Sequence, residues 1–462
     1  MKNIRQEMND LLHRGMDSHL KLAVTGLSRA GKTAFITSLV NQLLHSAGSE
    51  KLPLLNASRE GNLIGAKRVP QQNLLVPRFS YDDALTALHS EPPHWPVPTK
   101  DVSEIRLALR YKPTKSSKRI FSQTATLYLD IIDYPGEWLL DLPLLDLTYE
   151  QWCQTQFDGL TGTRRDLAKA WLQQIDAIEP FAEANEKQLE QVAQCYTDYL
   201  FSCKQAGLHW VQPGRFVLPG DLKGAPVLQF FPYQLLGRED ELDKADKHSS
   251  YQMLKSRYKE YQQKVVKRFY KDYFSTFDRQ IVLVDCLQPL NSGHESFTDM
   301  KSALEQLMKS FRYGRSSMLK RLFSPRIDKL LFAATKADHI TPDQHANLVS
   351  LLQQMVYPSW QHAAFENIAM ECISIASIQA TTNGFVSDGE NSIPAIQGTT
   401  CDDQPMTLYP GDVPKKLPGE EFWKNGHFDF NNFRPNQTEI DIPLPHIRVD
   451  KALQYLIGDK LK

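Results

Sequence analysis

The sequence lacks the cysteine patterns of secreted and metal-binding proteins. Its six cysteines are scattered over 462 residues, without a CxxC pair or a histidine at metal-ligand spacing. We therefore expect reduced thiols, as in a cytosolic protein. An 18-residue apolar run and a signal-peptide pattern are also missing, which predicts a cytoplasmic protein without a transmembrane segment.

An excess of one charge sign is also missing. Lysine and arginine number 53 and aspartate and glutamate 54, a formal net charge of -1. This balance gives no reason to expect a nucleic-acid partner. One basic and aromatic stretch, residues 249–277, has helical periodicity, so we expect its aromatic residues in a core and its cations in solvent.

Hydrolase signatures such as HExxH and GxSxG are absent as well, whereas short apolar runs are frequent. Five runs are typical of strands buried on both faces, and a sixth alternates as an antiparallel edge strand would. These are residues 21–26, 125–133, 280–286, 329–338 and 371–377, and residues 102–110 for the edge strand. Helical patterns separate most of them, which predicts an α/β fold with a mostly parallel sheet.

Two long interruptions and two ends complete the predicted organisation. An amphipathic N-terminal helix would pack on its own domain, with peripheral membrane contact left open. The expected segments are a helix in 1–20, an α/β domain in 21–145 and 281–380, an irregular insertion at 46–100, a helical subdomain at 146–280, and an irregular extension with a C-terminal helix at 381–462.

The segment "GLSRAGKT", Gly26 to Thr33, follows a strand and precedes a helix. This is the context of a P-loop, whose backbone amides surround a β-phosphate. In this role Lys32 would bridge the outer phosphates and the Thr33 hydroxyl would bind Mg²⁺. The other phosphate-binding residues would be Ser28, Arg29, Ala30, Gly31 and Ala34.

The segment "DIIDYPGEW" places Asp133 at the end of the next central strand. In P-loop proteins a carboxylate at this position holds magnesium, and a glycine three residues later, here Gly136, can sense the γ-phosphate. Asp133 and Gly136 are therefore predicted members of the same site.

The segment "FAATKADHI" carries Thr335, Lys336 and Asp338 at the end of another strand. A carboxylate there accepts hydrogen bonds from both N1 and N2 of guanine, which adenine cannot donate. The pattern favours guanine. A weaker element follows the last strand, where the amide of Ala376 or Ser377 could donate to the base carbonyl.

These motifs resemble the Ras-like GTPases, and the layout over most of the chain resembles the YcjX-like family of bacterial P-loop proteins associated with stress responses. The resemblance implies a Ras-like fold with additional elements, and binding and hydrolysis of GTP. It also implies a switch threonine that completes the magnesium site, for which Thr99 is the candidate and Ser103 the alternative.

Catalysis departs from the Ras pattern, because Glu137 stands where a water-orienting glutamine is usual. Glu137 could position water or be a bystander, and slow hydrolysis is expected. Large GTPases of the guanylate-binding type resemble this chain in carrying an arginine at the position of Arg29. In those proteins the arginine acts as an arginine finger in cis on dimerisation. Arg29 could act in the same way, with Lys32, or point into solvent or pair with a carboxylate.

The sequence thus predicts a magnesium-dependent, slow GTP-hydrolysing switch that takes GTP as substrate and GDP as product. A guanine-nucleotide-binding scaffold without turnover, and an ATPase or small-molecule kinase, are the alternatives. An effector protein is expected but not identified by any motif, and a homodimer stays open.

Overall fold

The computed structural model describes residues 17–46, 52–98, 100–114, 123–310, 327–365, 368–389, 391–425 and 428–462. The chain divides into two compact units. We call them the sheet unit (residues 1–134, 277–291 and 326–462) and the helical unit (residues 135–276 and 292–325). The predicted helix of residues 2–14 lies outside the described residues.

Among the described residues, seven strands form the main sheet of the sheet unit, in the order β2-β3-β4-β1-β5-β6-β7. The pairs β2–β3 and β3–β4 are antiparallel and the others are parallel. The bounds are β1 (Ser18–Gly26), β2 (Leu63–Val69), β3 (Ser103–Tyr111), β4 (Ala125–Asp133), β5 (Arg279–Val284), β6 (Lys329–Ala334) and β7 (Ala369–Ser374). The predicted α/β class with a mostly parallel sheet is confirmed.

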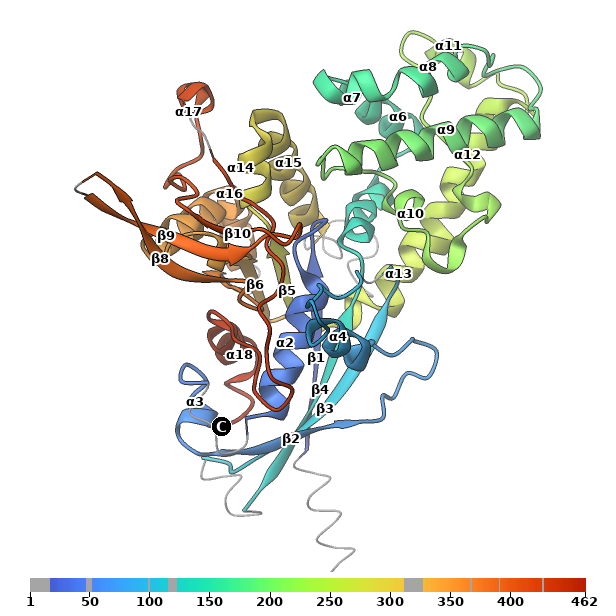
Figure 1. Ribbon diagram of the computed structural model, residues 1–462. Helices are drawn as coiled ribbons and strands as arrows, with labels where there is room; N and C mark the ends of the chain where they lie inside the picture. The colour runs from blue at the N-terminus through green and yellow to red at the C-terminus, as the bar shows by residue number, and fades with distance from the viewer. Residues whose placement is uncertain are drawn as a thin grey trace, which may run out of the picture. The chain divides into compact units, whose positions relative to one another are not determined.

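The sheet unit also contains helices, the longer of which pack against this sheet (Figure 1). Their bounds are α2 (Lys32–Leu44), α3 (Asn56–Arg59), α4 (Tyr81–Leu88), α14 (Leu287–Ser292), α16 (His345–Phe365), α17 (Glu420–Asn425) and α18 (Val449–Ile457). On one face, Phe35 and Leu39 of α2 and Leu453 of α18 pack with alternate strand residues such as Leu107 and Leu129. Each such side chain contributes about 1.5–3 kcal/mol when it is fully buried.

The first interruption is more regular than predicted. Residues 46–100 contain α3, β2 and α4, and β2 pairs with β3 outside it. The expected edge strand, β3, is therefore internal. β2 escaped prediction because most of its side chains are exposed or half-buried, so it has no buried apolar face. At the other end, Ser18 to Leu20 belong to β1 rather than to an N-terminal helix.

The C-terminal extension also contains strands where an irregular chain was expected. Among the described residues, β8 (Thr381–Asp388), β9 (Asn391–Thr399) and β10 (Pro405–Leu408) form a three-stranded antiparallel sheet in the order β10-β9-β8. A small core of Ala380, Ile396 and Phe433 supports it. The final helix is α18, which begins at Val449.

The helical unit begins at Pro135, earlier than the predicted subdomain, and includes α15. Its helices are η1 (Gly136–Asp146), α6 (Tyr149–Asp158), α7 (Gly162–Leu167), α8 (Lys169–Ile175), α9 (Glu186–Gln205), α10 (Gly214–Val217), η2 (Gly220–Leu222), η3 (Pro226–Leu228), α11 (Glu239–Leu242), α12 (Ser250–Glu260), η4 (Tyr261–Val266), α13 (Lys267–Asp272), η5 (Phe274–Thr276) and α15 (His294–Ser310). No helix in the described ranges is long and apolar enough to cross a bilayer.

An aromatic core holds the helical unit together. Trp152 stacks on Tyr258 with ring centroids 5.3 Å apart, and Tyr258 and Tyr261 are fully buried. On the same stretch of helix, the side chains of Lys264 and Arg268 are 73% and 76% exposed. The prediction of core aromatics and solvated cations for residues 249–277 is confirmed at these positions.

Candidate functional site

The P-loop segment joins β1 to α2 with a backbone that requires glycine at two positions. A Cβ on Gly26 would lie 2.7 Å from the carbonyl oxygen of Leu283 on β5, which is too close for any side chain. Gly31 has a φ of 80° and is the N-cap of α2. Glycine adopts this left-handed conformation without strain.

The amides of this loop are available to an anion. Among the described residues, those of Arg29, Gly31 and Lys32 have no acceptor, whereas the Ala30 amide donates to Leu27 and the Phe35 amide to Gly31. The first amides of a helix have no intrahelical partner, and the helix dipole adds positive potential. The loop therefore has the geometry of a phosphate site.

Arg29 has an unusual backbone for a non-glycine residue, with a φ of 63°. Its side chain is exposed and, within the described part of the chain, has no hydrogen-bond or ion-pair partner. Of the alternatives left open for Arg29, pairing with a carboxylate is therefore not observed. A strained backbone of this kind costs about 1–3 kcal/mol and tends to occur at functional sites.

Asp133 is placed beside the P-loop strand by the sheet register. It pairs with Val24 on β1 and with Ser103 on β3, and it is 1% exposed. Directly opposite residues of antiparallel strands have side chains on the same face. The buried Ser103 hydroxyl, which has no partner among the described residues, thus lies next to the Asp133 carboxylate. Thr99 lies outside the described residues.

These oxygen donors fit a magnesium site. Mg²⁺ is commonly held by one or two carboxylates together with water and substrate phosphates, so it does not need a cluster of acidic residues. No group of three or more His, Cys, Asp or Glu side chains in the described ranges could hold a metal. Thr33 at the start of α2, Asp133 and Ser103 supply the chemistry that Mg²⁺ needs with a nucleotide.

The chain after Asp133 is anchored in the sheet unit by Tyr134. Its ring is fully buried and stacks on Phe277, with centroids 5.6 Å apart. Its hydroxyl oxygen accepts a hydrogen bond of 2.6 Å from Gln280, and burial raises the pKa of the phenol above its usual range. Gly136 then begins the 3-10 helix η1, which belongs to the helical unit.

Glu137 is fixed within the helical unit. Its carboxylate accepts from the Nζ of Lys204 on α9 at 2.6 Å, and Glu137 is 5% exposed. Sequence reasoning missed Lys204, since 67 positions separate the pair and no motif marks it. The carboxylate that replaces the usual glutamine is thus ion-paired in this structure.

The same 3-10 helix carries a second buried carboxylate, Asp141. It accepts hydrogen bonds from the Tyr261 hydroxyl at 2.6 Å and from the amides of Gly214 at 2.8 Å and Arg215 at 3.3 Å. Burial raises the pKa of Asp141 to about 7 despite these donors. Asp141 and Glu137 together tie η1 to the rest of the helical unit.

The base motif follows β6. The backbone of Lys336 is left-handed, with a φ of 59°, and its Nζ lies 2.7 Å from Asp285 Oδ2. Burial acts to raise the pKa of Asp285, but the charge and hydrogen bond of Lys336, together with the Gln288 amide, lower it overall. Asp285 follows β5, and no sequence prediction assigned it to the site. Its position directly after a buried strand is the sequence feature that could have indicated it.

Asp338 is 5% exposed and ionised. Its Oδ2 accepts from the Ala380 amide at 2.8 Å, and its Oδ1 lies 3.1 Å from His339 Nδ1. Burial acts to raise the pKa of Asp338, but the interaction with His339 and the hydrogen bond from the Ala380 amide together lower it overall. Each carboxylate oxygen has two lone pairs, so one acceptor position remains on each. The N1 and N2 donors of guanine need two such positions.

The two amides predicted to reach the base differ in the structure. The Ala376 amide donates to the carbonyl of Ile447 at 3.1 Å, whereas the Ser377 amide has no acceptor among the described residues. Ser377 is therefore the better candidate of the two.

Two further elements meet at the base motif. The Thr381 hydroxyl donates to the Asp338 carbonyl, and the Phe433 ring contacts the His339 ring edge-on at 5.3 Å. Trp95 donates from Nε1 to the Phe433 carbonyl at 2.7 Å. The C-terminal extension and the first interruption thus both reach the base motif, which no sequence pattern had indicated.

Comparisons with known proteins show the family of this chain. The model of the YcjX-like family, DUF463, matches residues 20–461. A protein from Escherichia coli K12, named Ras-like GTPase YcjX, is 55% identical over 465 residues and covers 100% of both chains. A protein of the same name from Shewanella oneidensis MR-1 is 46% identical over 478 residues and covers 100% of this chain and 99% of its own.

Proposed function

Since the chain belongs to the YcjX-like family, we propose that it binds GTP with Mg²⁺ and hydrolyses it slowly, as a Ras-like GTPase. One observation carries the proposal. The free amides of the P-loop segment and the buried, ionised Asp338 follow the carboxyl ends of parallel strands of one sheet. Ligands of open α/β sheets bind at this edge.

The roles of the residues follow from their chemistry. The residues Ser28 to Ala34 surround the phosphates, with the amides of Arg29, Gly31 and Lys32 as donors and Lys32 Nζ on the outer oxygens. Thr33, Asp133 and either Thr99 or Ser103 hold Mg²⁺, which neutralises phosphate charge when it is bound. On the base, the Asp338 carboxylate accepts hydrogen bonds from N1 and N2, and the Ser377 amide donates to the carbonyl oxygen. Lys336 and Thr335 fix the conformation of the loop.

Arg29 supplies the positive charge that the hydrolytic step needs. Negative charge develops toward the leaving oxygen during γ-phosphoryl transfer, and an arginine brought to it accelerates the reaction about 10³- to 10⁵-fold. The exposed and unpartnered side chain of Arg29 is free to move there. We infer that it acts in one conformation or in a homodimer.

Glu137 gives the site its switch character. A carboxylate cannot donate to the γ-phosphate as the glutamine amide does, and this one is ion-paired with Lys204. Hydrolysis is therefore slow. Gly136 follows Asp133 and begins η1, so a displacement of Gly136 by the γ-phosphate is transmitted to the helical unit. The changed conformation of the helical unit is then recognised by an effector in the stress response.

The test is a comparison of GTP and ATP. The purified protein is incubated with Mg²⁺ and each nucleotide, and released phosphate and retained nucleotide are measured. We expect phosphate release with GTP only, dependent on Mg²⁺. Retention of GTP without release would favour a non-hydrolysing scaffold, and release from ATP at the same rate would favour an ATPase.

A further inference from the structure

The two β-sheets of the described chain end in four edge strands, which are β2, β7, β8 and β10. An edge strand presents unpaired N–H and C=O groups, which can pair with a strand of another chain. Folded proteins prevent this pairing with charged residues, prolines, bulges or very short edge strands. Three of these four edges have such protection.

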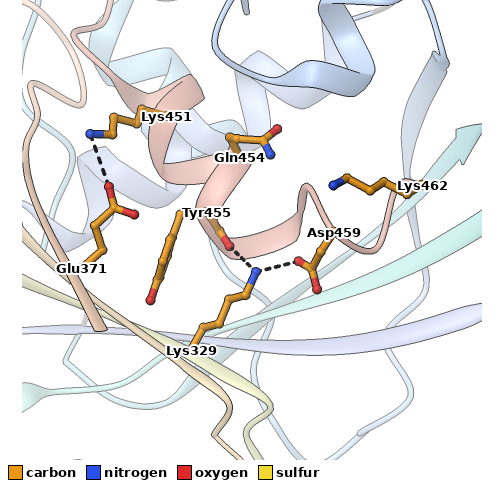
Figure 2. A pocket seen from close by; sticks show the side chains of 7 residues that line it. All are labelled: Lys329, Glu371, Lys451, Gln454, Tyr455, Asp459 and Lys462. Carbon is orange, nitrogen blue, oxygen red and sulfur yellow. Dashed lines mark hydrogen bonds and ion pairs between the residues drawn. The ribbon is translucent and has the colours of Figure 1, made fainter. Parts of the chain in front are cut away.

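The three protected edges use different means. β2 carries the exposed residues Lys67 and Arg68 and has a register shift near its start. β7 carries Glu371, whose carboxylate lies 3.2 Å from Nζ of Lys451 on α18 (Figure 2). β10 has only four residues and begins with Pro405. None of these edges offers a long, uncharged row of backbone groups.

The edge of β8 has none of these protections. β8 pairs with β9 over all eight of its residues without a register shift. No charged residue and no proline occur from Thr381 to Ser387, and Phe385 is 69% exposed. The hairpin of β8 and β9 extends outward from the rest of the sheet unit (Figure 1). Within the described part of the chain, this edge is therefore long, uncharged and open.

The pairing with β9 shows which backbone groups face the open edge. Hydrogen-bonded and non-hydrogen-bonded pairs alternate along antiparallel strands, and Phe385 lies opposite Pro394. Proline in a sheet stands where its nitrogen faces no paired strand, and β10 ends opposite Ile396, before it reaches Pro394. Phe385 and Pro394 thus form a non-hydrogen-bonded pair. The N–H and C=O groups of Asn383, Phe385 and Ser387 therefore point to the open edge, where they have no backbone partner among the described residues.

The chemistry of this edge favours its own sequence as the partner. A foreign strand is usually selected by charges or side-chain pockets, and residues 381–387 carry no charge that could select one. In an antiparallel pair centred on Phe385, this residue lies opposite its equivalent in the second copy, and Asn383 lies opposite Ser387. Aromatic pairs across strands are favourable, and no like charges oppose each other from 381 to 387. The edge of β8 is therefore complementary to itself.

We propose that β8 pairs antiparallel with β8 of a second copy of this chain, so that the two three-stranded sheets become one continuous sheet. The free groups of Asn383, Phe385 and Ser387 form the hydrogen bonds between the copies. Pairing through one short strand buries less than the roughly 1,200 Å² of a stable interface, so the dimer is reversible. Because the Ala380 amide donates to the Asp338 carboxylate, the copies meet beside their base motifs.

Sedimentation velocity of the full-length protein without added nucleotide tests the dimer. We expect the sedimentation coefficient to rise from the monomer value toward the dimer value as the protein concentration is raised. Phe385→Lys places two like charges opposite each other and should raise the dimer dissociation constant at least tenfold. Leu75→Lys, the same kind of change at a residue that is 94% exposed in the same unit, should leave it unchanged. A wild type that stays monomeric, or an unchanged dissociation constant in Phe385→Lys, would overturn the proposal.

Disulfide cross-linking tests the register, in a background with Cys195 and Cys401 replaced by serine because these are the cysteines not buried among the described residues. Opposite residues of a hydrogen-bonded pair have Cα atoms about 5.5 Å apart, which a disulfide can bridge. A mixture of Asn383→Cys and Ser387→Cys proteins should therefore form a covalent dimer on oxidation. Each variant alone should not, since its two cysteines would lie about 14 Å apart along the strands. No cross-link in the mixture, or equal yields from each variant alone, would overturn the proposal.

Discussion

Arg29 combines an exposed side chain, which has no partner among the described residues, with a left-handed backbone in the P-loop segment. A lysine or arginine without a function is usually placed where it does not strain the chain. The Arg29 side chain has no partner in the described part of the chain, whereas the carboxylate of Glu137 is held by Lys204. Arg29 is therefore available to act on the phosphate, whereas Glu137 is held away from this role by its ion pair.

Replacing Arg29 by alanine should reduce GTP turnover about 10³-fold while GTP affinity changes little, because the finger acts on charge that develops in the transition state. Turnover is measured by single-turnover phosphate release and affinity by nucleotide titration. Arg165→Ala, an exposed arginine of the helical unit, is the matched control. Equal hydrolysis in wild type and Arg29→Ala would exclude the finger.

Asp338→Asn should change base preference rather than abolish the fold. Asparagine retains one oxygen for the Ala380 amide but presents an NH₂ group that opposes the guanine donors, so GTP affinity should fall at least about 100-fold. Xanthosine triphosphate, which offers an acceptor at that position, should bind better to the variant than to wild type. Asp343→Asn, exposed and close in sequence, is the control, and unchanged GTP affinity in Asp338→Asn would contradict base reading by Asp338.

At the scale of elements, the 3-10 helix η1 contains the predicted phosphate sensor and belongs to the helical unit. Its first residue, Gly136, is the predicted phosphate sensor, and the stretch from Gly136 to Leu144 is buried. The Lys204 ion pair and the three donors to Asp141 hold it in the helical unit. An element held by so many specific contacts moves between discrete positions rather than gradually.

Lys204→Met should loosen η1, because it leaves the nearly buried carboxylate of Glu137 without its cation. Breaking a buried pair on one side costs about 3–5 kcal/mol, and the partial exposure of Lys204 reduces this to about 2 kcal/mol. The loosening of η1 is measured by hydrogen exchange of residues 136–146, and the loss of stability is measured by denaturant unfolding. The double variant Lys204→Met with Glu137→Gln should recover most of the loss, and a loss that persists would assign another role to Lys204.

The strands that the sequence predicted from apolar runs share one property, which is burial on both faces at their carboxyl ends. β1, β4, β5, β6 and β7 are continuous apolar runs, and motif residues follow directly after them. β2 and β10 have mostly exposed or half-buried side chains, and pairing with a neighbouring strand rather than an apolar pattern makes them strands.

The site residues that belong to local motifs were predictable from the sequence, and those from remote segments were not. The residues of local motifs, Gly26 to Thr33, Asp133 and Thr335 to Asp338, lie at one edge of the sheet as the strand order requires. Lys204, Trp95 and Phe433 come from remote segments, and only the folded chain shows their contacts. Sequence spacing cannot specify such partners, since loop lengths do not determine where a chain returns.

At the scale of the whole molecule, the chain has two compact units, and only one of them carries the P-loop and base motif. Ligands stabilise the state that binds them by mass action. GDP with Mg²⁺ should therefore raise the unfolding temperature of the sheet unit, whereas the helical unit responds to conditions that act on its own buried groups.

Asp141 makes the helical unit sensitive to pH. Its pKa is about 7 in the folded state and near 4 in the unfolded chain, so its contribution to stability is fully present below about pH 4 and is lost as pH rises through about 7. The helical transition in calorimetry should fall in temperature between pH 5 and pH 8. Between pH 5 and pH 8 about two of the three pKa units of linkage are sampled, which amounts to roughly 3 kcal/mol.

Asp141→Asn should remove most of this pH dependence, because the amide cannot ionise and its oxygen still accepts from Gly214. Relative to wild type, the variant should become more stable as pH rises, whatever its stability at pH 5. Asp243→Asn, an exposed change in the same unit, should leave the pH profile as in wild type. If the Asp141→Asn and wild-type profiles run parallel from pH 5 to pH 8, Asp141 ionises near its ordinary pKa and its hydrogen bonds outweigh burial.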